Sequence, residues 1–181
     1  MKKNQLILAS SLVVIGVLSR LIFNELKIYN FNAVTATAMF AGAYLAQGRM
    51  RYLIPLVTMF LTDAVLGFYY GPSMAINYGA LMLAVAAGTI YAKKPSFLNY
   101  MLAFLGSSIS FFLITNFGAW MFQTIEPQLY AHTFEGLMQA YAAAIPFYQN
   151  SVASNLLFSA VLFGGFEMAK VSLLSEKQVA A

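Results

Sequence analysis

One carboxylate and one guanidinium are the charged side chains best placed to do chemistry in this sequence. Asp63 lies in an apolar segment twelve residues after Arg51, which is about 18 Å along a helix. Arg20 reaches a similar depth in the first apolar segment, about 22 Å from Gln5. An ionisable group inside a bilayer is costly and by default suggests a function. We therefore expect either an ion pair between Arg20 and Asp63 that joins two spans, or a ligand or ion site at Asp63.

Neutral amides and aromatic rings gather near the outer ends of the apolar segments. An aromatic belt at the membrane interface would explain the rings, but such a belt does not require asparagines. Amides on several converging helix ends are typical of a pocket for an uncharged or zwitterionic organic ligand. The predicted ligand-binding residues are Asn30, Asn32, Asp63, Tyr70, Asn77, Tyr78, Asn116, Trp120 and Asn150.

Other kinds of site find little support in the sequence. There is no cysteine and a single histidine, His132, which excludes thiolate chemistry and any metal site with several histidines. Glu126, His132 and Glu135 are too few ligands to indicate a metal, and we read them as a solvated loop. No catalytic or nucleotide-binding motif is present. We therefore predict no enzyme activity, no metal and no cofactor.

The composition indicates a membrane protein. Hydrophobic residues form 61% of the 181-residue chain and charged residues 9%, whereas a soluble domain has roughly 25% charged residues. The apolar segments are long enough for six spans at about 20 residues each. We predict an all-α, six-helix transmembrane bundle in one domain, with an outer loop over residues 116–149 that contains a short interfacial helix near 135–144. The predicted spans are 5–23, 30–47, 52–70, 73–92, 97–115 and 151–171.

The basic residues predict the orientation. Arg20 and Lys27 fall on the outer half of the predicted bundle. The other eight basic residues fall on the inner side: Lys2, Lys3, Arg49, Arg51, Lys93, Lys94, Lys170 and Lys177. Basic residues are retained on the cytoplasmic side. We therefore expect both chain ends in the cytoplasm, and we read the net charge of +4 as a topology signal, with no nucleic-acid partner.

A stripe of small residues follows one face of the second apolar segment. Ala38, Gly42 and Ala46 are spaced four residues apart, so they lie on one helix face. In lipid, small residues allow helices to approach closely. The stripe therefore predicts either packing within the bundle or docking of a partner membrane protein.

Several segments together resemble a known group of proteins. Arg20 is followed by NFNAVTATAMFAG, PLVTMFLTDAVLG, FFLITNFGAW and AAIPFYQNSVASNLLFSAVLFGG. This arrangement, over residues 20–165, resembles an uncharacterised bacterial family of six-span putative transport proteins. That family is similar to the substrate-binding S components of energy-coupling-factor (ECF) vitamin transporters.

The resemblance implies a transport component of the bacterial inner membrane that captures a vitamin-like or nucleobase-like molecule on its outer face. It also implies a possible partner, an ECF-type coupling subunit with ATPases docked at Ala38, Gly42 and Ala46, although some relatives act alone. Cobalt ligation by a cysteine, known in one branch, cannot be carried over, because the chain has none. An alternative from another class is a non-transporting accessory subunit of a larger membrane complex, which would have a partner but no ligand.

Overall fold

The computed structural model describes residues 3–45, 48–68, 71–123 and 128–169, and these ranges contain helices and no strand. All-helical architecture therefore holds for this part of the chain. Six α-helices and a π-helical turn, η1, follow one another in this order: α1 Lys3–Glu25, α2 Val34–Tyr44, α3 Met50–Leu66, α4 Ser73–Tyr91, α5 Phe97–Met121, α6 Phe134–Ser159 and η1 Ala160–Gly164.

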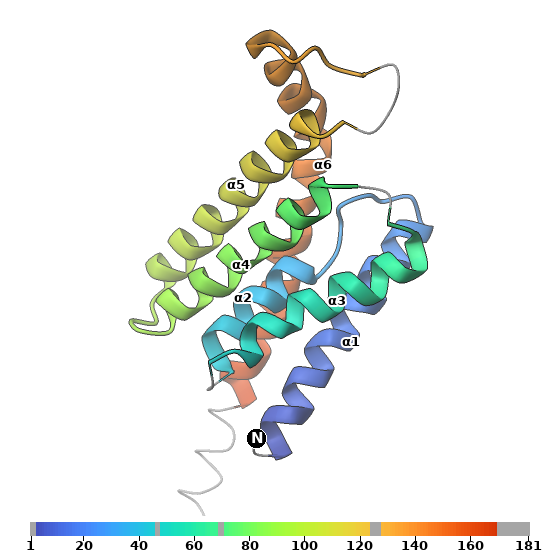
Figure 1. The fold of residues 1–181 in the computed structure, drawn as a ribbon. Coiled ribbons are helices and arrows are strands. Elements are labelled where there is room, and N and C mark those ends of the chain that lie inside the picture. Colours follow the sequence, from blue (N-terminus) through green and yellow to red (C-terminus); the bar gives the residue numbers. More distant parts are fainter. Residues whose placement is uncertain (1–2, 46–47, 69–70, 124–127, 170–181) are drawn as a thin grey trace, which may run out of the picture.

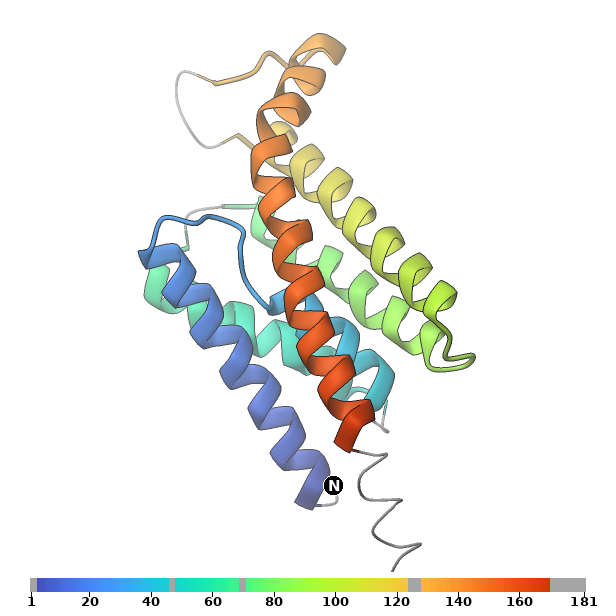
Figure 2. The ribbon, with the colours of Figure 1, turned by 180° about the vertical axis from the view of Figure 1, so that it is seen from behind.

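The short helix α2 lies at the centre of the bundle (Figure 1). It packs against α1, α3, α4 and α6, while α1 also packs on α3, and α5 on both α4 and α6. Successive helices run in alternating directions, and the N-terminus lies near the C-terminal end of the last helical segment, drawn in red (Figure 2). The ends of the helices therefore form two faces, one that includes the N-terminus and one opposite to it.

Four helical segments are long and apolar enough to cross a membrane: residues 4–25, 73–91, 97–121 and 134–169. The predicted spans 5–23, 73–92 and 97–115 each fall on one of them. By contrast, the predicted spans 30–47 and 52–70 correspond to helices of only 11 and 17 residues. The helix α2 is short because residues 26–33 leave the helical path, with Lys27 and Asn30 in the left-handed region at φ 60° and 62°.

Most described residues of the outer loop expected over residues 116–149 are helical, so its predicted secondary structure is corrected, while its position outside the membrane stays a prediction. The helix α5 continues to Met121, and α6 already begins at Phe134, with Pro146 in its interior. A proline removes one N–H donor and usually kinks or breaks a helix. Here Tyr141 and Tyr148, on either side of Pro146, both contact the Phe112 ring of α5. The Tyr141 hydroxyl also donates to the Leu113 carbonyl at 2.9 Å. The expected interfacial helix near 135–144 is the first part of this long helix.

The continuous helical segment 134–169 is longer than a membrane is thick. Its 36 residues correspond to about 54 Å, against roughly 30 Å for the hydrocarbon core. The first turns of α6 extend beyond the neighbouring ends of α4 and α3 (Figure 1). A π-helical turn, Ala160–Gly164, interrupts the α-helical hydrogen bonding near the other end.

Thr133 caps the N-terminus of α6, and its Oγ1 accepts a hydrogen bond from the Gly136 N–H at 3.2 Å. We predict that Thr133→Ala lowers the free energy of unfolding by about 1 kcal/mol, the usual cost of losing such a cap. Thr133→Ser keeps the hydroxyl and should restore most of this loss. Thermal unfolding in detergent would check both values, and equal melting temperatures for Thr133→Ala and the wild type would contradict the assignment.

One glycine on each helix lies where α2 and α4 contact each other. A Cβ on Gly42 would overlap the Val85 carbonyl of α4, and a Cβ on Gly88 would overlap the Met39 carbonyl of α2. The backbones of the two helices therefore touch, the kind of contact that small residues permit between helices in a membrane. Gly42 and Gly88 lie in the last turns of α2 and α4, so the backbones approach most closely near the C-terminal ends of the two helices.

The proposed docking stripe is part of this internal contact. Ala38 and Gly42 are buried in the bundle, and Gly42 faces α4, so neither is open to a partner in this structure. Ala46 lies outside the described residues. Of the two interpretations of the stripe, the structure supports packing within the bundle. The physical reason is that α2 is surrounded by the chain's own helices.

Candidate functional site

Arg20 and Asp63 form an ion pair between α1 and α3, with Arg20 Nη2 2.6 Å from Asp63 Oδ1. Asp63 is almost fully buried, and the Tyr78 hydroxyl of α4 donates to its Oδ2 at 2.6 Å. Arg20 Nη1 also donates to the Thr62 hydroxyl. The two charges therefore compensate each other, and the network ties three helices together at one level.

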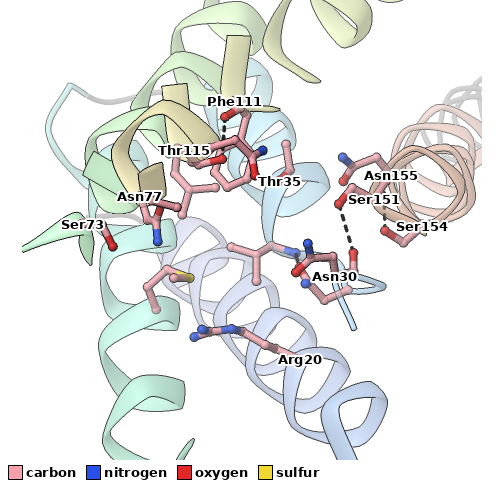
Figure 3. Close-up of a pocket in the computed structure, with 16 residues that line it drawn as sticks. Arg20, Asn30, Thr35, Ser73, Asn77, Phe111, Thr115, Ser151, Ser154 and Asn155 are labelled. Atoms are coloured by element: carbon pink, nitrogen blue, oxygen red, sulfur yellow. Dashed lines mark hydrogen bonds between the residues drawn. The ribbon is translucent and has the colours of Figure 1, made fainter. Parts of the chain in front are cut away.

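A cavity of about 220 Å³ lies beside this network, between the ends of the helices opposite the N-terminus. Its walls carry amides and hydroxyls from four helices, α2, α4, α5 and α6, and from the α1–α2 loop, and α1 adds the charged side chain of Arg20 (Figure 3). Met59, Leu81 and Phe111 add apolar surface. The polar lining residues are Arg20, Asn30, Asn32, Thr35, Ser73, Asn77, Thr115, Asn116, Ser151, Ser154 and Asn155.

A second hollow of about 610 Å³ adjoins the first. The two share Arg20, Asn30 and Asn32 in their walls. The second hollow is lined in addition by Asp63 and by aromatic residues such as Phe147. Arg20 and the α1–α2 loop therefore stand at the boundary between a small amide-lined cavity and a larger, more aromatic one.

The α1–α2 loop is held in place by polar contacts on both of its sides. The Ser19 hydroxyl accepts from the Ala33 N–H, and the Asn32 side chain accepts from the Val34 N–H, both at 3.0 Å. On the other side, α6 donates to two carbonyls of the loop, from Asn150 Nδ2 to Tyr29 at 3.0 Å and from Ser151 Oγ to Asn30 at 3.3 Å. These bonds position Asn30 and Asn32 in the cavity wall.

Five of the nine predicted ligand-binding residues line the two cavities. Asn30, Asn32, Asn77 and Asn116 line the first cavity, and Asp63 lines the second. The Tyr78 hydroxyl donates a hydrogen bond to the Asp63 carboxylate, and the Asn150 side chain donates to the Tyr29 carbonyl of the α1–α2 loop. The ring nitrogen of Trp120 donates to the Ala131 carbonyl at 3.0 Å. Neither Asn150 nor Trp120 lines either cavity, and Tyr70 lies outside the described residues.

Sequence reasoning missed the contribution of α6 to the cavity. Ser151, Ser154 and Asn155 line it from that helix, and all three were assigned to an ordinary span. Their spacing of i, i+3 and i+4 places them on one helix face. Three polar groups on one face of an otherwise apolar helix were the signal that could have identified them.

The chemistry available in the cavity is recognition by hydrogen bonds. Amides and hydroxyls dominate the lining as far as the structure describes it, and the cation found there, Arg20, is already paired with Asp63. His132 lies away from the cavity, where its ring stacks edge-on against Trp120 and its Nε2 lies 3.1 Å from the Trp120 carbonyl oxygen. A neutral, hydrogen-bonding interior of this kind is suited to hold a small molecule.

Comparison with known proteins gives a family without an assigned activity. No curated protein and no solved structure matches this chain. One family model matches residues 1–178, nearly the whole sequence. The chain therefore belongs to the family of unknown function DUF6580.

Proposed function

We propose that this protein is a membrane transport component that binds a small vitamin-like or nucleobase-like ligand on its outer face, in the manner of an ECF S component. The observation that carries the proposal is the amide-lined cavity. Four separately predicted asparagines, distributed over the α1–α2 loop, α4 and α5, line one hollow together. Close packing explains apolar residues between helices, but it does not explain a polar cavity in a chain that is 61% hydrophobic.

The basic residues support an outward-facing cavity. Lys3, Arg49, Arg51, Lys93 and Lys94 lie at helix ends on the same face as the N-terminus. If this face is cytoplasmic, as the positive-inside rule predicts, the cavity opens near the outer surface of the proposed bacterial inner membrane. In this proposal all six helices belong to a six-span bundle, with α1, α4, α5 and α6 crossing fully and the shorter α2 and α3 completing its centre.

Release of the ligand to the inside requires a second conformation. Either an ECF-type coupling subunit with ATPases drives that change, or the bundle rocks alone. A coupling subunit would have to bind a surface other than the buried face of α2, since α4 already covers that face. The proposal includes no catalytic residue, because its central step is binding and movement of an unchanged molecule.

Native mass spectrometry of the gently purified protein tests the proposal. We expect one small molecule per chain, lost when Asn116 or Asn155 is changed to leucine, because each change removes an amide from the cavity wall. Asn99→Leu is the matched control. Asn99 lies at the other end of α5, where its side chain donates to the Lys94 carbonyl, and this variant should keep the molecule.

Two outcomes would contradict the proposal. A protein that is empty from gentle preparations, and that instead co-purifies with a membrane subunit, would favour the accessory role. A bound molecule equally retained by Asn155→Leu and Asn99→Leu would show that the cavity is not the binding site.

A further inference from the structure

Two amides in the small cavity have no hydrogen-bond partner within the described part of the chain. Asn155 is only 5% exposed, lines the cavity, and points into it from α6 (Figure 3). Asn77, which is partly exposed, lines the facing wall on α4. Buried amides are normally hydrogen-bonded, because burial without a partner carries the full desolvation penalty of the group. The Asn155 amide is therefore suited to receive its partner from a bound molecule, and the Asn77 amide lines the same space on the opposite wall.

The amide group restricts what that partner can be. Its NH₂ donors and carbonyl acceptor lie side by side in one plane. The best complement is a flat edge that offers an acceptor and a donor in the same plane, as when asparagine binds the edge of adenine with two hydrogen bonds. Asn77 and Asn155 stand on opposite walls, so a molecule between them would need such polar atoms on two of its edges. Phe111 offers an aromatic ring among the apolar wall residues, and flat rings pack well on such a surface.

Charge and size restrict the ligand further. Among the described residues of the cavity lining, Arg20 is the only ionisable one, and Asp63 already balances its charge. A bound anion would leave an uncompensated negative charge in a poorly solvated place, and a bound cation an uncompensated positive one. The volume of about 220 Å³ is below the roughly 300–1,000 Å³ typical of sites for drug-sized molecules. The cavity is therefore suited to an uncharged molecule of one or two rings.

We infer that the small cavity selects an uncharged, flat nitrogen heterocycle whose edge carries a hydrogen-bond donor beside an acceptor, such as a lactam ring. This inference rests on the proposed function and narrows its ligand class. It assigns recognition of two ligand edges to Asn77 and Asn155, the second of which the sequence analysis did not include. Charged vitamins and polyols fall outside the class.

Calorimetric titration of the full chain in lipid nanodiscs tests the inference. Uracil and hypoxanthine are the lactam probes, and 1-methylhypoxanthine is the matched compound that lacks the lactam N–H. We expect hypoxanthine to bind at least about tenfold more tightly than its methylated form, since one hydrogen bond to a buried group is lost and its partner stays unpaired. Indole-2-carboxylate and ribitol, an anion and a polyol, should bind weakly or not at all.

Variants connect the binding to the two amides. Asn155→Leu and Asn77→Leu should each weaken hypoxanthine by about tenfold and reduce the preference over the methylated form, while Asn99→Leu should change neither. Melting temperatures close to wild type would show that the variants fold. Equal binding of the two hypoxanthines, or unchanged binding in Asn155→Leu, would overturn the inference.

The native mass spectrum separates this inference from the proposed function. A molecule released from the cavity that is a polyol, an acid or an amine would overturn the ligand class and leave the binding function standing. A native mass spectrum without any bound small molecule, together with no calorimetric binding of any probe, would overturn both the ligand class and the binding function. A released lactam that is missing from the calorimetric panel would support the class.

Discussion

Asp63→Asn is expected to lower the free energy of unfolding by about 3–5 kcal/mol, the usual cost of removing one partner of a buried ion pair. The substitution keeps the shape of the side chain and an acceptor for the Tyr78 hydroxyl, but it removes the negative charge that faces Arg20. The guanidinium, with only 13% of its side chain exposed, would then be a poorly solvated charge without compensation. Titration with sodium dodecyl sulfate in mixed micelles would measure the loss.

A double variant provides the control for this prediction. Arg20→Met together with Asp63→Leu replaces both charges by apolar groups, which often costs little when the volume is similar. We expect it to recover most of the stability lost in Asp63→Asn. Lys93→Met, which removes an exposed charge at the opposite end of the bundle, should leave stability nearly unchanged.

The same pair of measurements decides between the two interpretations of Asp63. A structural role predicts that Asp63→Asn loses stability and that the double variant regains it. If Asp63→Asn instead unfolds like the wild type but no longer retains a ligand in the native mass spectrum, the carboxylate belongs to the binding site and the structural interpretation is wrong.

Gly88→Ala is expected to lower the free energy of unfolding by about 3 kcal/mol, near the upper end of the usual cost of overpacking a core. The added methyl group would overlap the Met39 carbonyl, and backbone cannot move aside as a flexible side chain would. Gly42→Ala meets the Val85 carbonyl in the same way and should have a similar effect. Unfolding in sodium dodecyl sulfate would again report the loss.

Gly79→Ala is a matched control on the same helix. A Cβ at Gly79 has no atom within 4 Å, so this change should be neutral or slightly stabilising, because alanine favours the helix. Equal stabilities of Gly88→Ala and Gly79→Ala would show that α2 and α4 are not in backbone contact.

We also expect Gly88→Ala to weaken ligand retention, because α2 and α4 both contribute to the cavity wall through Thr35 and Asn77.

The sequence by itself determined the helical, membrane-type character and much of the polar site. Long apolar segments bounded by basic or turn-forming residues predicted α1 and α4 closely and the start of α5, because helix length and composition are local properties. The amides also stood out, because a polar group is conspicuous in an apolar chain whatever the fold. Asn30, Asn32, Asn77 and Asn116 were selected on that basis and line one cavity.

Only the tertiary structure decided which apolar surfaces are internal and which helices share the cavity. Lipid and protein interior are both apolar, so hydrophobicity cannot distinguish a helix buried in the bundle from one that faces lipid. The sequence therefore could not show that α2 is central and that its small-residue stripe packs on α4. It also could not show that α6 begins at Phe134 and continues past Pro146, because packing against α5 overrides the local tendency of proline to end a helix. Asn155 enters the cavity through that packing, and its unpaired amide is visible only when its neighbours are known.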